Sequence, residues 1–275
     1  MAIQNSVLTN PSSFVALRTL NGINRSLDVT QNRVSTGLKV AGALDDASNF
    51  AIAQGIRAEL TAIDAVTQGL NNAKGIGKVA IAGVTGISNL LSDVRGKLTE
   101  LANEGITTSQ RQILQNDFNE LISQAANFIA NASFNGVNLI QSGANTVNTL
   151  SNLSGGLLTL TAQSAVNTQV GAIATATLTN ATNAQSVIAN EFSNLESVVN
   201  TALGALGAEV RALNLQTTFL EEIRDATDEG LGNIVDADLA RESARLTSLQ
   251  VQQQLSTQTL SIANQRPQTL LGLFG

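Results

Sequence analysis

The sequence contains no cysteine, histidine, tryptophan or tyrosine among its 275 residues. Without cysteine there is no disulfide, no thiolate nucleophile and no thiolate metal ligand. Without histidine the chain lacks the side chain most used as a base near neutral pH, which is also the commonest metal ligand. The net charge of −6 and the pI near 4.7 argue against nucleic acid, which needs a basic face. The composition therefore predicts no cofactor, no metal and no nucleic-acid partner, and it disfavours an enzyme.

Long apolar runs are also missing from the chain. No run approaches the roughly 20 apolar residues that a membrane-spanning helix needs, so no membrane association is expected. The first charged residue is Arg18, so a basic region ahead of an apolar core, as in a secretory signal, is not found. The sequence predicts a cytosolic protein, or one exported by a route that reads no cleaved signal peptide.

Apolar residues with heptad spacing dominate both flanks of the middle region. Heptads sustained over such lengths predict coiled-coil-like packing of long helices. Three long helices with complementary seams predict a mainly α fold, a long antiparallel coiled-coil bundle. The N-terminal series is Val84, Ile87, Leu91, Val94, Leu98 and Leu101, a second stripe is Leu114, Phe118, Leu121, Ala125 and Phe128, and the C-terminal series is Phe192, Val199, Leu206, Leu213 and Leu220.

The middle of the chain carries no charge, because residues 121–190 contain no Asp, Glu, Lys or Arg. It is rich in Asn, Ser, Thr, Ala and Gly, with β-type runs at Leu157–Thr161 and Ile173–Thr179. With Gly155, Gly156 and Asn180 as turn residues, these runs predict hairpins or short strands. We expect this small β-hairpin region to close the bundle at its far end.

The two ends of the chain repeat the helical pattern more weakly. From Leu246 onward the C-terminal segment carries one formal charge, Arg266, and it is rich in Gln, Ser and Thr. Such a helix has too few leucines for a stable core and too few charges for a well-solvated surface, so we expect it to become stable when copies pack together. Near the N-terminus, Leu20, Leu27 and Val34 are seven residues apart, with Ile23 between the first two. We predict that both ends are largely disordered in the monomer and fold on assembly.

Three motifs resemble those of bacterial flagellin, and the similarity covers nearly the whole chain outside roughly 140–185. The segment RVSTGLKVAGALDDASNFAIA at 33–53 is similar to the family signature in its N-terminal region. Phe-Asn-Gly at 134–136 is similar to the family's turn after the third helix. Ala-Asn-Gln-Arg-Pro-Gln at 263–268, followed by two leucines, is similar to its closing motif. In size the chain resembles the short flagellins of alphaproteobacteria such as Caulobacter.

The resemblance implies a structural subunit of the bacterial flagellar filament, located outside the cell. It implies a terminal helical core domain (1–42 plus 236–275), whose paired terminal helices form an inner tube. It also implies a wall domain (43–140 plus 186–235) and a short variable tip (141–185). The implied partners are further copies of the chain, the type III export apparatus with a chaperone, and the filament cap and hook-associated proteins. The residues expected in the self-assembly core are Leu20, Ile23, Leu27, Val34, Leu246, Leu249, Leu260, Leu270 and Leu271.

Two short segments carry further expectations. Asp45 and Asp46 resemble a catalytic or metal-binding pair, but adjacent residues point apart on a helix. They are better explained as carboxylates at a helix start, with Gly37 and Gly42 allowing a break between helices. In flagellins sensed by the flagellin-specific Toll-like receptor, Gln-Arg precedes Val-Arg on the wall helix. Here Ser92 and Asp93 replace that pair, which implies weak or absent receptor recognition.

Three alternatives to a filament subunit fit the sequence less well. A hook–filament junction protein shares similar termini but forms no long polymer. A metalloprotease inserted in a flagellin needs a His-Glu-x-x-His motif, and this chain has no histidine. A coiled-coil adhesin should show longer uninterrupted heptads and an export signal.

Overall fold

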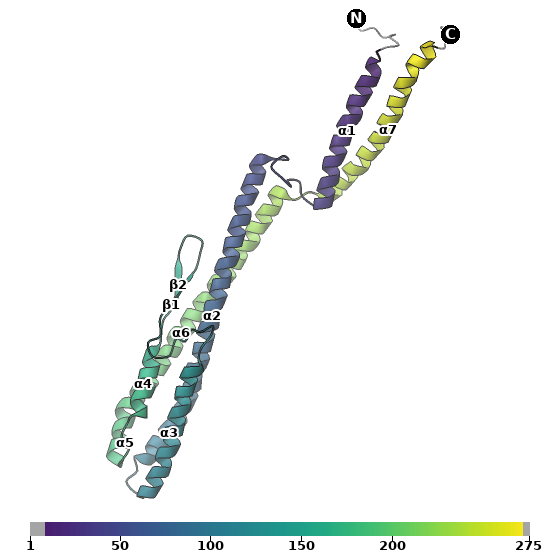
Figure 1. The fold of residues 1–275 in the computed structure, drawn as a ribbon. Coiled ribbons are helices and arrows are strands. Elements are labelled where there is room, and N and C mark those ends of the chain that lie inside the picture. Colours follow the sequence, from purple (N-terminus) through teal and green to yellow (C-terminus); the bar gives the residue numbers. More distant parts are fainter. Residues whose placement is uncertain (1–8, 272–275) are drawn as a thin grey trace. The chain divides into compact units, whose positions relative to one another are not determined.

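The computed structural model describes the backbone of residues 9–271 and the side chains of residues 9–265. Most of this part is helical, with one two-stranded sheet. Figure 1 shows the elements in chain order. They are α1 (Pro11–Thr36), α2 (Ala47–Leu101), α3 (Thr108–Asn131), β1 (Val147–Leu150), β2 (Leu157–Leu160), α4 (Ser164–Ala174), α5 (Ala181–Val187), the π-helix η1 (Ile188–Phe192), α6 (Ser193–Val235) and α7 (Leu239–Leu271).

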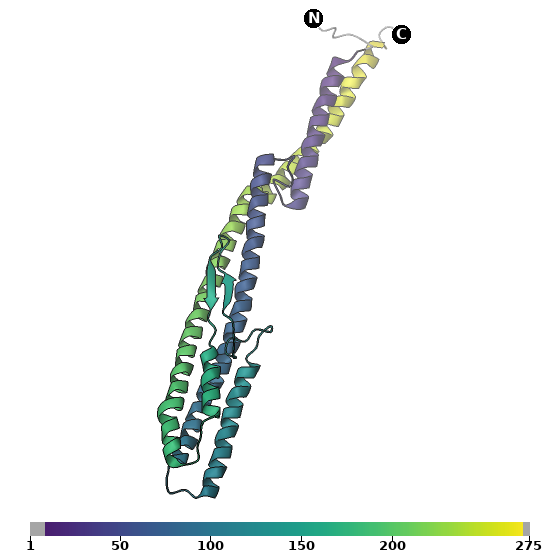
Figure 2. The same ribbon diagram turned by 60° about the vertical axis from the view of Figure 1, so that its left-hand side comes forward.

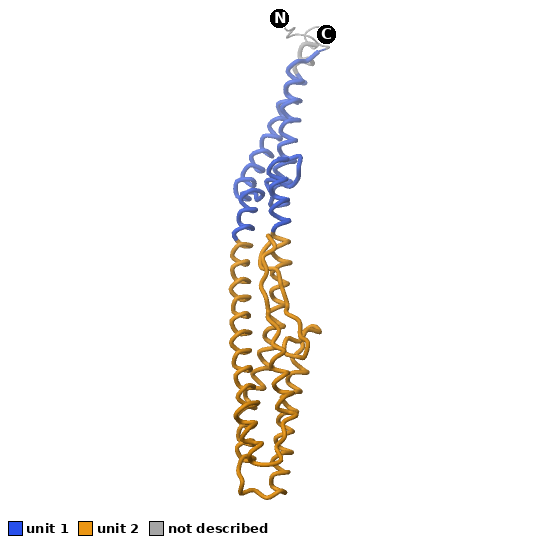
Figure 3. The backbone as a smooth tube through the Cα atoms, turned by 90° about the vertical axis from the view of Figure 1, so that its left-hand side faces the viewer, with its two compact units in different colours: residues 1–59, 226–275 blue, residues 60–225 orange. Residues whose placement is uncertain are grey.

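The chain forms two compact units, coloured separately in Figure 3. Unit 1 comprises residues 1–59 and 226–275, and unit 2 comprises residues 60–225. The division falls inside α2 and α6, whereas the sequence suggested boundaries at 42 and 235. The assignment of segments to an inner tube, a wall and a tip stays a prediction.

Unit 2 has its core where the heptads predicted it. Every residue of the series from Val84 to Leu101 is at most 8% exposed, and so are Phe192, Val199, Leu206 and Leu213. These side chains join those of α3 and α4 in one apolar cluster. The long helices are therefore held together by a continuous seam, as expected for coiled-coil-like packing.

The uncharged middle folds into one hairpin followed by helices. β1 pairs with β2 in antiparallel register, with Val147 opposite Leu160 and Leu150 opposite Leu157. The strand predicted at Leu157–Thr161 is thus confirmed, but the one predicted at Ile173–Thr179 is wrong. Ile173 lies in α4, where its side chain is fully buried, and the chain then turns towards α5. A short apolar run of this kind does not distinguish a strand from a buried helix, and burial on α4 decided it.

The hairpin lies alongside α2 and α6 rather than at the far end of the bundle (Figure 2). The side-chain amide of Gln216 on α6 donates to the carbonyl oxygen of Ser151 at 2.6 Å. The hydroxyl of Thr161, just after β2, donates to Glu209 at 2.6 Å. The far end of unit 2 is instead formed by the connections between α2 and α3 and between α4 and α5.

The Phe-Asn-Gly motif forms a tight turn after α3. Asn135 and Gly136 have φ of 50° and 78°, and Phe134 and Val137 exchange two backbone hydrogen bonds of 2.9 Å. This is the geometry that an Asn-Gly pair favours. The ring of Phe134 covers α2 at Gly75, where a Cβ atom would lie 2.7 Å from the ring. The glycine on α2 therefore makes room for the aromatic residue of the motif.

α2 also contains a stretch that is long and apolar enough to cross a membrane on length and composition alone. Such a stretch is weak evidence, because the core helix of a helical bundle passes the same test. Leu70, Ile76, Val84, Ile87 and Leu91 of α2 all belong to the core of unit 2. We therefore interpret α2 as a core helix.

Candidate assembly surface

α1 and α7 form an antiparallel pair in unit 1. Three polar contacts step along the two helices in opposite directions. The side-chain amide of Asn10 donates to the carbonyl oxygen of Ala263 at 2.7 Å. The amide of Gln253 donates to the side-chain oxygen of Asn24 at 2.8 Å. The guanidinium of Arg33 lies 3.2 Å from the carboxylate of Glu242. These contacts fix the register of the pair along most of its length.

The residues predicted for the self-assembly core lie largely in the seam of this pair. Leu249 is buried, at 8% exposed, and the side chains of the others in the described range are half-buried. Those others are Leu20, Ile23, Leu27, Val34, Leu246 and Leu260. The side chains of Leu270 and Leu271 lie outside the described residues. The heptad stripe is thus covered to a large extent within a single chain.

A second set of apolar side chains on the pair remains open. Eight large apolar residues of α1 and α7 are between 45 and 61% exposed, and we call seven of them, all except Leu239 at the start of α7, the outer stripe. Sequence analysis missed this set because a heptad search selects one apolar stripe on each helix. The signal was available in the apolar residues left outside the heptads. The outer stripe is Phe14, Val15, Leu17 and Val29 on α1 with Val251, Leu255 and Ile262 on α7.

Gly37, Gly42, Asp45 and Asp46 lie between the end of α1 and the start of α2, and their role as a hinge stays a prediction. Gly37 ends α1 with φ of 75°, a conformation that favours glycine, and its N–H donates to the carbonyl oxygen of Arg33. The carboxylate of Asp45 accepts hydrogen bonds of 3.0 Å from the backbone N–H groups of Ala41 and Gly42. The carboxylate of Asp45 therefore stabilises the turn between α1 and α2.

Asp46 caps the start of α2. Its carboxylate accepts hydrogen bonds from the backbone N–H groups of Asn49 at 3.0 Å and Ser48 at 3.1 Å. The hydrogen bond from the Asn49 backbone is the main reason why the pKa of Asp46 lies below its ordinary value. The start of a helix carries partial positive charge, which favours an ionised cap.

The bend is also tied to the end of α6. The backbone N–H of Lys39 donates to the carbonyl oxygen of Val235 at 2.7 Å, and that of Ala237 donates to Gly37 at 2.8 Å. Leu38 and Asp236 form an isolated antiparallel bridge. The segment after α1 and the segment between α6 and α7 are therefore joined by backbone hydrogen bonds. These bonds limit how freely the bend can move.

Ser92 and Asp93 are exposed on α2 in unit 2. They line a polar groove of about 610 Å³ between α2 and α3. In this groove the ammonium of Lys97 lies 3.4 Å from both Glu100 and Asp117. The hydrogen bond to Glu100 is the main reason why the pKa of Lys97 lies above its ordinary value. The groove keeps an excess of negative charge, because Asp93, Glu100, Asp117 and Glu120 line it together with a single lysine.

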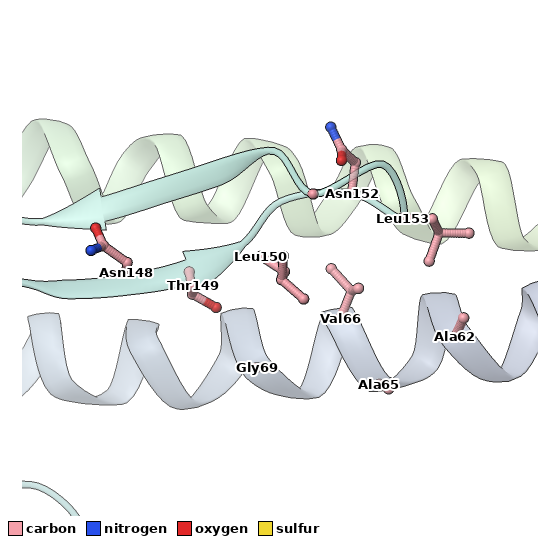
Figure 4. Close-up of a pocket in the computed structure, with 10 residues that line it drawn as sticks. Ala62, Ala65, Val66, Gly69, Asn148, Thr149, Leu150, Asn152 and Leu153 are labelled. Atoms are coloured by element: carbon pink, nitrogen blue, oxygen red, sulfur yellow. The ribbon is translucent and has the colours of Figure 1, made fainter.

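Another groove, of about 560 Å³, separates the hairpin from α2, and Figure 4 shows its lining. Leu150 and Leu153 of the hairpin face Ala62, Val66 and Gly69 of α2, so the groove is mainly apolar. No catalytic or metal-binding arrangement accompanies it. Within the described residues, no group of three or more His, Cys, Asp or Glu side chains is suited to hold a metal ion.

An antiparallel pair of helices with a second, open apolar face is typical of a helical protein that packs against other chains. The comparisons identify the family. The sequence pattern of the bacterial flagellin N-terminal helical region matches residues 7–146, and that of the C-terminal helical region matches residues 197–274. The chain belongs to the bacterial flagellin family, and it is a structural subunit of the flagellar filament.

Individual relatives agree over almost the full length. The chain is 35% identical to flagellin FljK of Caulobacter vibrioides, over 98% of both chains. It is 32% identical to a flagellin of Brucella melitensis, over 98% of this chain and 99% of that one. Among solved structures, a protein of Vibrio parahaemolyticus provisionally assigned as flagellar hook-associated aligns with a TM-score of 0.59. At 15% identity, covering 70% of this chain and 100% of that one, it shows the fold alone.

Proposed function

We propose that this subunit polymerises by coupled folding and assembly, in which the outer stripe of α1 and α7 is buried against neighbouring copies. The observation that carries the proposal is the outer stripe itself, seven large apolar side chains about half exposed on one helical pair. Exposed apolar residues gathered on one element mark an interaction surface, whereas scattered ones need no explanation. A filament supplies the matching surface from its other copies.

The energetics of the pair support coupling between folding and assembly. Ordering a residue costs about 1–2 kcal/mol, and the seam of α1 and α7 consists mainly of half-buried side chains. Completing the burial of a half-exposed apolar side chain returns about 1 kcal/mol. Contacts between copies therefore add the stabilisation that the isolated pair lacks. Slow amide exchange at Leu27 in the free monomer would contradict this step.

Export and capping partners follow from the same role. We propose that the subunit leaves the cell unfolded through the flagellar type III apparatus, bound by a chaperone at α7, and meets the cap and hook-associated proteins outside. The weakly stabilised terminal pair supports export in an unfolded state. Calorimetry of an α7 peptide with the chaperone of the same cell tests this, and an absence of binding would remove α7 as the target.

We further propose weak recognition by the flagellin-specific Toll-like receptor. Asp93 is exposed on α2, so an approaching partner meets an anion at a place where recognised flagellins carry a cation. Like charges facing each other across an interface cost several kcal/mol. A cell reporter should respond poorly to this protein and better to the variant Asp93→Arg. A strong response to the unaltered chain would refute the proposal.

The polymerisation proposal is tested by electron microscopy of purified subunits after addition of ammonium sulfate, a salt that favours burial. Unaltered subunits should form long filaments, and Leu255→Asp should not. Gln250→Asp places the same charge at an exposed polar position of α7, about 140° around the helix from Leu255, and serves as the matched control. Filaments from the Leu255→Asp variant would exclude the outer stripe as the assembly surface. Persistent monomers of the unaltered chain would favour a junction protein.

A further inference from the structure

A groove of about 330 Å³ on the α1–α7 pair gathers three of the chain's 15 basic residues. It is lined by Arg25, Arg33 and Arg245, with the hydroxyl residues Ser26 and Thr30 between them. Val29 of the outer stripe also lines it, so the groove is continuous with the proposed assembly surface. The polymerisation mechanism does not by itself explain why positive charge is concentrated there.

The positive charge of the groove is only partly compensated inside the chain. Arg33 contacts Glu242, but its buried Nε atom has no hydrogen-bond partner. The Nε of Arg25 donates to the backbone carbonyl of Asn21 at 3.3 Å. Within the described residues, neither Arg25 nor Arg245 forms an ion pair with a carboxylate. Three guanidinium groups converging beside one carboxylate leave an excess of positive charge, which favours an incoming anion.

Charge is strongly segregated within unit 1. The helices α1 and α7 together carry six arginines against two acidic residues. The segments that adjoin them, 37–59 and 226–238, carry two basic against seven acidic residues. Each copy of the chain therefore presents a basic rod and an acidic bend, which makes two copies complementary although the whole chain is acidic.

Besides Asp45, five acidic side chains of these segments are exposed. One of them, Asp238, accepts a hydrogen bond from the backbone N–H of Arg241, and another, Glu59, lies on α2. Asp228, Glu229 and Asp236 are exposed, whereas Asp45 and Asp46 already accept backbone hydrogen bonds in the turn. Glu229 and Asp236 are seven residues apart, close to two helical turns, so they lie at nearly the same angle and about 10 Å apart along the axis. Arg25 and Arg33 are eight residues apart on α1, which corresponds to about 12 Å. The two sets are opposite in sign and similar in spacing along the helix axis.

We propose that the groove of Arg25, Arg33 and Arg245 receives the carboxylates of Glu229 and Asp236 from a second copy of this chain. The inference rests on the proposed polymerisation and names one contact within it. The hydroxyls of Ser26 and Thr30 supply further donors for a carboxylate. The contact sets the register between copies, because the apolar outer stripe alone is not directional.

Charge reversal tests the contact through the critical concentration for polymerisation at low salt, measured by sedimentation. The variants Arg25→Glu with Arg245→Glu, and Glu229→Arg with Asp236→Arg, should each raise it about tenfold or more. All four changes in one chain should restore it to within about threefold of the unaltered protein. Arg211→Glu, an exposed reversal in unit 2, serves as the control and should have little effect.

A second measurement covers the case in which a reversed variant fails to fold. In Arg25→Gln with Arg245→Gln, polymerisation should lose most of its dependence on sodium chloride, because salt screens the ionic contact of the unaltered chain. If unaltered subunits polymerise and the reversals or neutral changes alter nothing, the groove contact is wrong and the assembly function stands. The contact is also wrong if the four-fold variant shows no rescue. If unaltered subunits form no filaments, both proposals fail.

Discussion

Arg33 on α1 places its guanidinium Nη1 3.2 Å from the Oε1 of Glu242 on α7, and the pair is largely shielded from water. The side chain of Glu242 is 11% exposed and that of Arg33 is 27% exposed. The two residues are separated by 209 positions in the sequence. Both lie near the bend of unit 1, so they join the first and last helices at the end where the chain enters and leaves the pair.

Removing one partner of this ion pair should weaken the α1–α7 pair. Glu242→Gln leaves a partly buried guanidinium without its carboxylate, so we expect a loss of about 1–3 kcal/mol. Amide exchange at Leu27 and Val34 in assembled filaments measures the effect. Asp28→Asn, at an exposed position of α1, is the control. If Arg33→Gln with Glu242→Gln costs as much as the two single changes added together, the two side chains are not coupled.

Two glycines of α2 should respond in opposite ways to alanine. A Cβ atom at Gly83 would lie 2.8 Å from the Cβ of Ala132 and 3.4 Å from the carbonyl oxygen of Phe128, so Gly83→Ala overpacks the seam. We expect a destabilisation of about 1–3 kcal/mol. At Gly96 nothing lies within 4 Å of the added atom. There the higher helix propensity of alanine should stabilise α2 by about 0.5–1 kcal/mol.

Thermal unfolding followed by far-ultraviolet circular dichroism compares the two alanine variants directly. The same substitution in the same helix differs only in what surrounds the new methyl group. Equal shifts of the melting temperature for the two variants would show that the close approach of α2 to the end of α3 does not limit packing.

The start of α2 should lose stability in acid because of Asp46. The pKa of Asp46 in the folded chain lies below its ordinary value of 3.8, chiefly because the Asn49 backbone donates to the carboxylate. The stabilisation is therefore present above the unfolded pKa and is lost as the pH falls through the folded pKa. An Asp46→Ala variant should show faster amide exchange at Phe50 and Ala53 than the unaltered chain near pH 7.

Amide exchange is then repeated at an acid pH below the folded pKa of Asp46, where protonation removes the carboxylate charge that only the unaltered chain carries at this position. The difference between Asp46→Ala and the unaltered chain should shrink there. Ser48→Ala, a neighbouring change that removes no titrating group, is the control. A difference that stays equal at both pH values would show that the charge of Asp46 does not contribute to the cap.

Periodicity predicted the helical part of the fold, because the heptad spacing of apolar residues can be read from the local sequence. Val84, Val94 and Leu98 are buried as their spacing indicated, and Leu157–Leu160 forms a strand next to the glycines that favour a turn. The strand predicted at Ile173–Thr179 was wrong, because Ile173 lies in α4. The apolar residues of this run are too few to show a period, so contact of α4 with α3 determined its conformation.

The terminal helices show a second limit of prediction from sequence, which concerns the partner that covers an apolar face. Leu27 and Leu249 were predicted to belong to the self-assembly core of paired terminal helices, and in the single chain they lie on α1 and α7, which pack against each other. The stripe that remains open contains Val251 and Leu255, which no heptad selected. A sequence shows that a face is apolar, but it does not show which of two available partners covers it.

The sequence by itself determined that this protein is a long helical subunit with no histidine or cysteine chemistry, and it predicts that its ends fold on assembly. Its motifs were sufficient for the family. Only the tertiary structure decided which apolar and charged side chains stay open on α1 and α7. The physical reason is that exposure depends on what packs against a helix, and Arg33 meets Glu242 across 209 positions of chain that no local pattern spans.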